Sequence, residues 1–440
     1  MDRPITEQAV FTPWQHTVLC KAMWRIVPFL FGCYVIAYLD RVNVGFAALS
    51  MNKDVGLSPS QYGFGVGLFF FGYFALEIPS NLMLQRIGAR VWIARIMITW
   101  GLISAATALV TGPTGFYAMR FLLGLAEAGF VPGVFLYLAS WFPGVWRSRT
   151  TAAFLVGIPV AGLFGSPISG FLLTLDGWIG LRGWQWLLVL EGLPAVFLGI
   201  ACLFVLSDRP SEAEWLAPEE REWLSGRLAE ERDDIATHSP GGVLSALANP
   251  CVLICAATNF AMIMGSSGVA YWTPLIIRNF GLTYVQVGMV TAIPPLVAMV
   301  GMVLWSRSAD RTGKRIAHVA ATGILGFCGL AVSAFAETPA LAIAGLTATV
   351  LASTSFQASF WAIPPGFLTG RAAAGGIALI VSVGNLGGFT GPYLVGYLKQ
   401  ATDSYQVALL LLSFCILCSA GLVTLAGRMI AARRAAYVPS

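Results

Sequence analysis

Charged side chains are scarce in this sequence. Lys, Arg, Asp and Glu together make up 11% of its 440 residues, whereas a soluble globular domain carries about 25%. Hydrophobic residues make up 57% and gather in runs of about 20, the length that an α-helix needs to cross a bilayer. A transmembrane β-barrel would show short alternating segments instead. The sequence therefore predicts an all-α membrane protein with many spans.

Residues that carry enzymatic chemistry are also few. The three histidines, His16, His238 and His318, fall in expected inner loops or at span ends, and the eight cysteines are scattered, mostly through apolar runs. The sequence has no Ser/His/Asp set, no phosphate-binding loop and no His/Cys group at metal-ligand spacing. It also lacks the basic, aromatic-rich face of a nucleic-acid-binding protein. We therefore expect no enzymatic activity, no cofactor, no metal and no nucleic-acid partner.

Twelve apolar runs are long enough to be spans, and the placement of positive charge supports that count. With both termini inside, the inner loops and tails hold twenty Lys and Arg residues and the outer loops hold four, as the positive-inside rule requires. We expect a bacterial-type inner membrane, cytoplasmic termini and no cleavable signal peptide, because the first span is too long for one. The expected spans are 24–49, 61–84, 91–111, 114–139, 150–174, 184–207, 251–276, 285–306, 317–335, 339–361, 373–398 and 405–428.

One long polar stretch, residues 208–250, divides the spans into two sets of six. We therefore expect an N-terminal six-helix bundle over 1–207, a cytoplasmic linker with a short amphipathic helix over 208–250, and a C-terminal six-helix bundle over 251–440. The loops after the second and eighth spans are both basic and centred on a glycine, which indicates that the two bundles are pseudo-symmetric. In transporters with such repeats, the substrate site lies near the membrane midplane between the halves.

Three segments resemble motifs of the major facilitator superfamily. The loop Asp310–Arg315 is similar to its loop motif, Arg120–Ala128 to its fourth-helix motif and Gly162–Gly170 to its fifth-helix motif. In the first half of the chain, Gln85 stands where the loop motif usually has an aspartate. The glycine-rich run can equally be explained by close helix packing through small residues.

Further blocks resemble the anion:cation symporter family, the bacterial permeases for sugar acids, tartrate and phthalate. The resemblance runs from about residue 20 to residue 430, and it implies a major facilitator fold that works by alternating access. Carboxylates at two of the matching positions serve proton coupling in that family, and the arginine next to the first one binds the substrate carboxylate. The blocks are Leu39–Asn43, Gly72–Asn81, Phe360–Pro365 and Gly384–Tyr393.

Asp40 and Arg41 in the first span, and Arg120 and Glu127 in the fourth, are charged residues inside apolar runs. An ionised side chain at the bilayer centre costs at least ~2.5–3.5 kcal/mol and is a functional candidate by default. Asp40 and Arg41 are adjacent and so diverge by about 100° on a helix, which means that each needs another partner. Arg120 and Glu127 are seven residues apart and share one face. We expect Arg120 to lie near Asp40, and Arg41 and Glu127 to face the same water-filled cavity.

The chemistry of these side chains suggests their roles. An arginine stays charged and grips a carboxylate with two parallel donors, so Arg41 is the candidate for substrate binding. Asp40 and Glu127 can titrate, because burial and nearby arginines move a carboxylate in opposite directions, and the resemblance assigns both to proton coupling. A purely structural ion cluster between the first and fourth helices is the alternative.

The remaining candidates are polar or aromatic. We expect Tyr38, Tyr73, Arg120, Trp361 and Asn385 to contact substrate, although each of them can also be explained as packing or structural. Asp310 and Arg311 are the gating candidates. The second half has no acid at cavity depth, so the carboxylate end of a ligand is expected against the first half and its neutral end against the second.

These observations favour a monomeric, proton-coupled symporter that imports a small organic carboxylate, such as a sugar acid, hydroxy acid or aromatic acid. Its partners are then the substrate anion, protons and the lipid bilayer. Two alternatives stay open from the sequence: an organic-anion exchanger, and a transporter-like sensor without flux.

Overall fold

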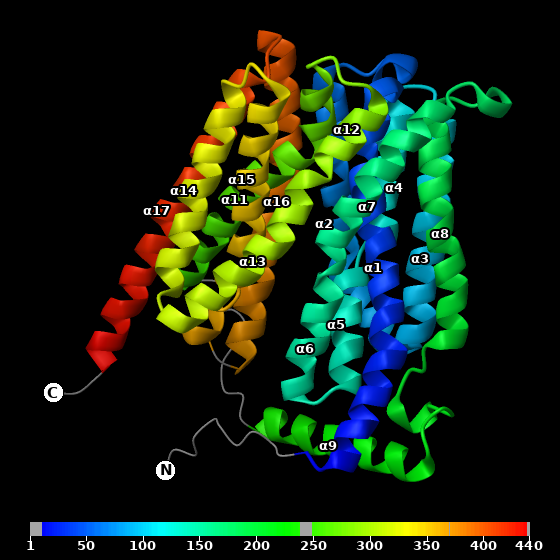
Figure 1. Cartoon of the computed structure of the whole chain (residues 1–440). Coiled ribbons are helices and arrows are strands. Elements are labelled where there is room, and N and C mark those ends of the chain that lie inside the picture. The colour runs from blue at the N-terminus through cyan, green and yellow to red at the C-terminus, as the bar shows by residue number, and fades with distance from the viewer. Residues whose placement is uncertain (1–10, 238–248, 369, 438–440) are drawn as a thin grey trace.

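The computed structural model describes residues 11–237, 249–368 and 370–437. Within those residues every regular element is a helix, and twelve helical segments are long and apolar enough to cross a membrane. The predicted all-α fold and the predicted number of spans are confirmed. Figure 1 shows two bundles side by side, coloured blue to green and green to red.

The N-terminal bundle is formed by α1 to α8. Two of its spans are each made of two consecutive helices, α4 with α5 and α6 with α7. The bounds are α1 Pro13–Val55, α2 Pro59–Ile87, α3 Ala89–Ala106 with the short η1 Thr107–Leu109, α4 Pro113–Glu127, α5 Phe130–Trp141, α6 Gly144–Leu155, α7 Gly157–Leu172, η2 Leu173–Leu175, η3 Trp178–Gly180 and α8 Gly183–Val205.

The C-terminal bundle is formed by α11 to α17, with α12 and α13 sharing one span. In the sequence, the helix α9 comes between the two bundles. The bounds are η4 Pro210–Glu212, α9 Pro218–Thr237, α11 Pro250–Arg278, α12 Tyr284–Thr291, α13 Ile293–Thr312, α14 Arg315–Ala334, α15 Pro339–Phe360, η5 Pro364–Gly366, α16 Gly370–Thr402 and α17 Gln406–Tyr437.

Local sequence explains where several of these helices begin and end. Thr12, Ser58 and Thr283 each cap the helix that follows, and each forms a reciprocal capping box with a glutamine three residues later, which satisfies two free N–H groups at once. Gly56 and Gly313 end α1 and α13 with positive φ angles of 73° and 66°, a conformation that glycine adopts without strain.

The helix α9 lies across one end of the N-terminal bundle (Figure 1). Lys21 Nζ of α1 donates to Glu220 Oε2 at 2.8 Å, and the ring of Trp223 packs edge-on against Trp14 with centroids 5.7 Å apart. Partial burial raises the pKa of Glu220, but the hydrogen bonds from Lys21 and from the Ala217 N–H outweigh it and leave the pKa below its ordinary value. The predicted linker thus contains the helix α9, while its residues 238–248 lie outside the described residues.

The two bundles touch mainly at the end opposite α9, called the far end below. There Tyr62 Oη of α2 donates to the Tyr271 carbonyl of α11 at 3.1 Å, and the Ser60 N–H donates to Gln400 Oε1 of α16 at 3.2 Å. The ring of Tyr62 also packs edge-on against Trp272 at 5.0 Å. In the described ranges, no hydrogen bond or ion pair joins the bundles at the α9 end. The two bundles are therefore closed against each other at the far end.

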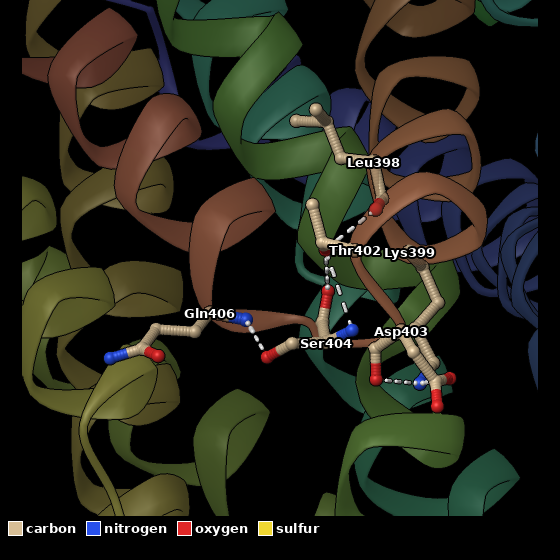
Figure 2. A network of polar contacts seen from close by, with 6 residues as sticks. All are labelled: Leu398, Lys399, Thr402, Asp403, Ser404 and Gln406. Carbon is tan, nitrogen blue, oxygen red and sulfur yellow. Dashed lines mark hydrogen bonds and ion pairs between the residues drawn. The ribbon is translucent and has the colours of Figure 1, made fainter.

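The turn from α16 to α17 is also ordered at the far end, as Figure 2 shows. Lys399 Nζ donates to the carbonyl and to Oδ1 of Asp403 at 2.7 and 3.0 Å, and Thr402 Oγ1 donates to the Leu398 carbonyl at 2.8 Å. The Gln406 N–H, at the first residue of α17, donates to Ser404 Oγ at 3.1 Å. These bonds fix the angle at which α17 leaves α16, the helix that packs against both α2 and α11.

Candidate functional site

An ion pair joins the first and fourth spans. Arg41 of α1 donates from Nε to Glu127 Oε1 of α4 at 2.6 Å, and its Nη2 lies 2.6 Å from the same oxygen. Glu127 Oε2 is buried without a hydrogen-bond partner. The Arg41 side chain stays 23% exposed, whereas that of Glu127 is 1% exposed. The pair therefore presents its positive partner outward and buries its negative one.

Aromatic rings flank Arg41. Its guanidinium carbon lies 5.4 Å from the ring centroid of Phe69 and 5.2 Å from that of Tyr73, both on α2, within cation–π range. Tyr38 lies one turn before Arg41 on the same helix face, is half-buried, and makes no hydrogen bond among the described residues. Tyr38 and Tyr73 therefore lie beside Arg41, and their contact with a substrate stays a prediction.

Asp40 is turned away from Arg41 and is 1% exposed. Its Oδ2 accepts from the indole N–H of Trp100 at 2.6 Å, and its Oδ1 accepts from the Asn43 amide at 2.9 Å and from the Ser104 hydroxyl. All three donors are neutral. Arg120, which was expected near Asp40, interacts with this carboxylate electrostatically, but within the described residues no ion pair joins the two. Three neutral donors from α1 and α3 occupy the carboxylate instead.

Arg120 of α4 is 2% exposed, and neither its Nε nor its Nη2 has a hydrogen-bond partner. Its guanidinium carbon lies 5.1 Å from the centroid of Phe69, the ring that Arg41 also approaches. A buried guanidinium whose donors lack hydrogen bonds is costly, so Arg120 is a candidate for binding an anionic ligand.

The C-terminal bundle contributes neutral groups, but not all at the depth of Arg41. The indole N–H of Trp361 donates to Gln357 Oε1 at 2.7 Å, so that donor is occupied. Depth can be compared by counting residues from the far end of each helix at a rise of 1.5 Å per residue. Trp361 follows the last residue of α15 and lies ~33 Å from the far end of that helix, whereas Arg41 lies ~21 Å from the far end of α1. Asn385, half-buried on α16, makes no described hydrogen bond and lies ~25 Å from its far end. Asn385 fits the predicted site better than Trp361.

The predicted gating residues lie apart from this site. Asp310 Oδ1 accepts from Arg315 Nη2 at 3.4 Å across the turn between α13 and α14, and both Asp310 and Arg311 are exposed. Within the described ranges neither residue contacts the N-terminal bundle by a hydrogen bond or an ion pair. The loop therefore does not connect the two bundles in this conformation.

Trp100 and Ser104 are not among the residues predicted from the sequence. A signal was present: the two residues lie four apart on α3, so both face the same neighbour. The break in the fourth span directly after Glu127 is not predicted either. There Ala128 leaves the helical region with a ψ of 129° and Gly129 has a φ of 88°, and interrupted helices often mark ion and substrate sites in transporters.

Removing one donor tests the Asp40 cluster. Ser104→Ala is expected to lower the free energy of unfolding by about 1–3 kcal/mol, because it leaves a buried carboxylate oxygen short of a hydrogen bond. Ser140→Ala is the matched control, since that hydroxyl only donates to a carbonyl of its own helix. Reversible unfolding in bicelles measures both changes. In an Asp40→Leu background Ser104→Ala should have little effect, and an equal loss in both backgrounds would rule out the hydrogen bond as the cause.

A family model described as "Major Facilitator Superfamily" matches residues 30–392. The chain belongs to the major facilitator superfamily. It is 46% identical to a protein of Agrobacterium vitis described as "Putative tartrate transporter", over 93% of this chain and 91% of that protein. It is 40% identical to the "Quinolone resistance transporter" of Acinetobacter baumannii, over 92% of this chain and 93% of the relative.

Solved structures of the superfamily share the fold. A bacterial homologue of the human lysosomal transporter Spinster, in an inward-facing and occupied conformation, superimposes with a TM-score of 0.75 at 14% identity, over 95% of this chain and 98% of that chain. This likeness shows the shared fold. The family model and the relatives show that this chain is a membrane transporter of a solute and not an enzyme. The expected fold and family are confirmed.

Proposed function

We propose that this transporter imports a small organic carboxylate together with protons, with Arg41 as the substrate-binding residue and Glu127 and Asp40 as the proton-coupling residues. The observation that carries the proposal is the 2.6 Å ion pair between Arg41 and Glu127. It gives one arginine two competing anions: the carboxylate of the protein and the carboxylate of the substrate.

Glu127 and the substrate carboxylate compete for Arg41, and this competition couples substrate binding to protonation. Both described contacts of Arg41 go to a single oxygen of Glu127, and the exposed part of the guanidinium is available to an incoming carboxylate. When Glu127 takes up a proton, its attraction for Arg41 weakens and the arginine is freed for the substrate. Linkage is reciprocal, so bound substrate draws Arg41 from Glu127 and changes the ease with which that carboxyl gains or loses a proton. Asp40, one residue before Arg41 on α1, serves as the second proton-coupling group.

The second arginine favours a dianion. Arg120 approaches the same Phe69 ring as Arg41 and has two nitrogens without a partner. A substrate with two carboxylates could neutralise both arginines, and its hydroxyls could reach Tyr38, Tyr73 or Asn385. The resemblance of the chain to a protein described as a tartrate transporter supports a small hydroxy dicarboxylate. Trp361 then contacts substrate only during entry.

We further propose that the α9 end and both termini lie on the cytoplasmic side of a bacterial-type inner membrane, which the distribution of Lys and Arg supports. Because the bundles are joined at the far end, this structure is the inward-facing state of the cycle. The gating loop with Asp310 and Arg311 would then contact the other bundle only when the α9 end closes. The two bundles, divided at residues 208–250, act as the two moving domains of a monomer.

The substrate contact is tested by Arg41→Lys. Its dissociation constant for tartrate is expected to rise about 10- to 100-fold, because a lysine ammonium cannot replace the planar two-donor fork and a hydrogen bond to a charged group contributes about 1.5–3 kcal/mol. Isothermal titration calorimetry on the purified protein measures it, after thermal-shift screening against tartrate, sugar acids and aromatic acids at two pH values identifies the best ligand.

The matched control is Arg182→Lys. That arginine is 60% exposed in a far-end loop and forms only loose pairs, with Asp54 at 3.7 Å and with Asp176 at 3.9 Å, so its replacement should leave binding unchanged. An unaltered dissociation constant in Arg41→Lys would count decisively against a bidentate contact. Uptake by wild-type liposomes that needs an internal counter-anion but no pH gradient would replace the symporter with an exchanger.

A further inference from the structure

A groove of about 430 Å³ lies on the outside of the C-terminal bundle, between α14 and α17. Figure 1 shows these two helices side by side at the outer edge of that bundle. Ala320 and Ile324 line it from α14, and residues at three- and four-residue spacing from Leu417 to Arg428 line it from α17. That spacing places the α17 residues on one helix face, so the groove follows the helix towards the α9 end.

Small residues create the hollow. A Cβ atom added at Gly323 of α14 would lie 2.8 Å from the Ala420 Cβ and 3.1 Å from the Ala420 N, so the two backbones nearly touch and form the floor. A Cβ added at Gly421 would meet nothing within 4 Å. Ile324 and Leu425 stay 52% and 46% exposed and form apolar walls. The groove is thus open, and its middle is apolar.

One end of the groove is basic. Arg428 lies seven residues beyond Gly421, which is ~10 Å along the helix, and it is exposed. In the part of the chain that the structure describes, Arg428 makes no hydrogen bond or ion pair, whereas Arg315 is paired with Asp310 at 3.4 Å. A Cβ added at Gly427 would lie 2.8 Å from Ile316, in the first turn of α14. The neighbouring Arg428 is therefore at the same depth as that turn, which follows Lys314.

We propose that this groove binds one anionic phospholipid, with an acyl chain along Gly421 and its phosphate on Arg428. The groove opens on the outer side of the bundle, the side that would face the bilayer. Its middle is lined by apolar residues and by Thr424, whose hydroxyl already donates to the Ala420 carbonyl at 2.7 Å. Its single charged lining residue lies at a span end, where lipid headgroups are. The positive charge of Arg428, level with Lys314 and Arg315, complements a headgroup with net negative charge. This site is independent of the transport mechanism proposed above.

Native mass spectrometry of the purified full-length protein, titrated with phosphatidylglycerol or phosphatidylcholine, tests the site. Wild-type protein is expected to bind one phosphatidylglycerol molecule more tightly than any phosphatidylcholine. Arg428→Gln should weaken that binding roughly tenfold, since a charge-assisted hydrogen bond is lost. Gly421→Leu should weaken it similarly by filling the groove, and the open space around Gly421 means that the protein should still fold.

Matched controls separate this site from general lipid contact. Arg307→Gln removes another exposed arginine near the α9 end of the same bundle, and Gly32→Leu adds the same side chain at another glycine with nothing within 4 Å; both should bind phosphatidylglycerol as the wild type does. The proposal is overturned if Arg428→Gln and Gly421→Leu bind like the controls, or if phosphatidylcholine binds equally well. It is equally overturned if inorganic phosphate competes fully, or if Gly421→Leu changes only the oligomeric state.

Discussion

Glu127→Gln is expected to abolish accumulation of substrate against its gradient while leaving substrate exchange intact. Glutamine keeps the shape of the side chain and an oxygen that can accept from Arg41, but it cannot carry a proton between the two sides of the membrane. Arg41 loses its only described anionic partner and becomes more available to the substrate carboxylate. Net uptake driven by a proton gradient should therefore fall to the level of passive equilibration, and exchange of labelled for unlabelled substrate in liposomes should continue.

The matched control for Glu127→Gln is Glu191→Gln. Glu191 of α8 is another buried carboxyl of the same bundle, 4% exposed, and it accepts from Ser169 at 2.6 Å with no contact to Arg41. A glutamine there can keep the bond from Ser169, so accumulation should survive. If Glu127→Gln concentrates substrate as the wild type does, then Glu127 is not a proton-coupling group, whatever its ion pair with Arg41.

The sequence predicted the spans well, because hydropathy measures how favourably each segment is transferred from water into lipid. The helices themselves are longer than their apolar cores: α1 begins at Pro13 and ends at Val55, whereas its expected span was 24–49. The additional residues at its start are held by α9 and by capping, which are contacts between segments and leave little trace in a hydropathy pattern.

Helix periodicity predicted only part of the site. It separated Asp40 from Arg41, because adjacent residues point in different directions, and it placed Arg41 and Glu127 in one space, where they form an ion pair. It did not predict which donors hold Asp40, since spacing along one helix does not say how that helix is rotated against its neighbours. The carboxylate of Asp40 faces α3, whose Trp100 and Ser104 reach it, and not α4.

The sequence also did not predict which conformational state the structure adopts. One chain must form both an inward-facing and an outward-facing packing that differ by only a few kcal/mol, and hydropathy is the same in both. The glycine-rich run Gly162–Gly170 is explained by its packing here: Gly165 lies against Leu39, and a Cβ on Gly170 would be 2.6 Å from the Tyr284 carbonyl of the other bundle. Small residues of the motif therefore serve the contact between the bundles.

Gly288→Leu is expected to hold the far end open and to stop uptake. A Cβ at Gly288 of α12 would lie 2.6 Å from the Ser166 carbonyl and 3.1 Å from the Gly170 Cα of α7, and backbone atoms cannot move aside as a flexible side chain can. Overpacking of this kind costs about 1–3 kcal/mol, which disfavours the closed far end by roughly 5- to 150-fold. Gly288→Ala should give a smaller shift in the same direction.

Spin labels at Lys53 and Glu337, one on each bundle at the far end, report this change as a longer distance in pulsed electron resonance. The exposed native thiols Cys328 and Cys418 must first be replaced. Gly32→Leu, whose added side chain meets open space, should leave both the distance and the uptake unchanged. If uptake is lost but the distance distribution is normal, the defect lies elsewhere. If the distance is longer in both Gly288 variants and increases with side-chain size, the contact between Gly288 and Gly170 sets the balance between the two states.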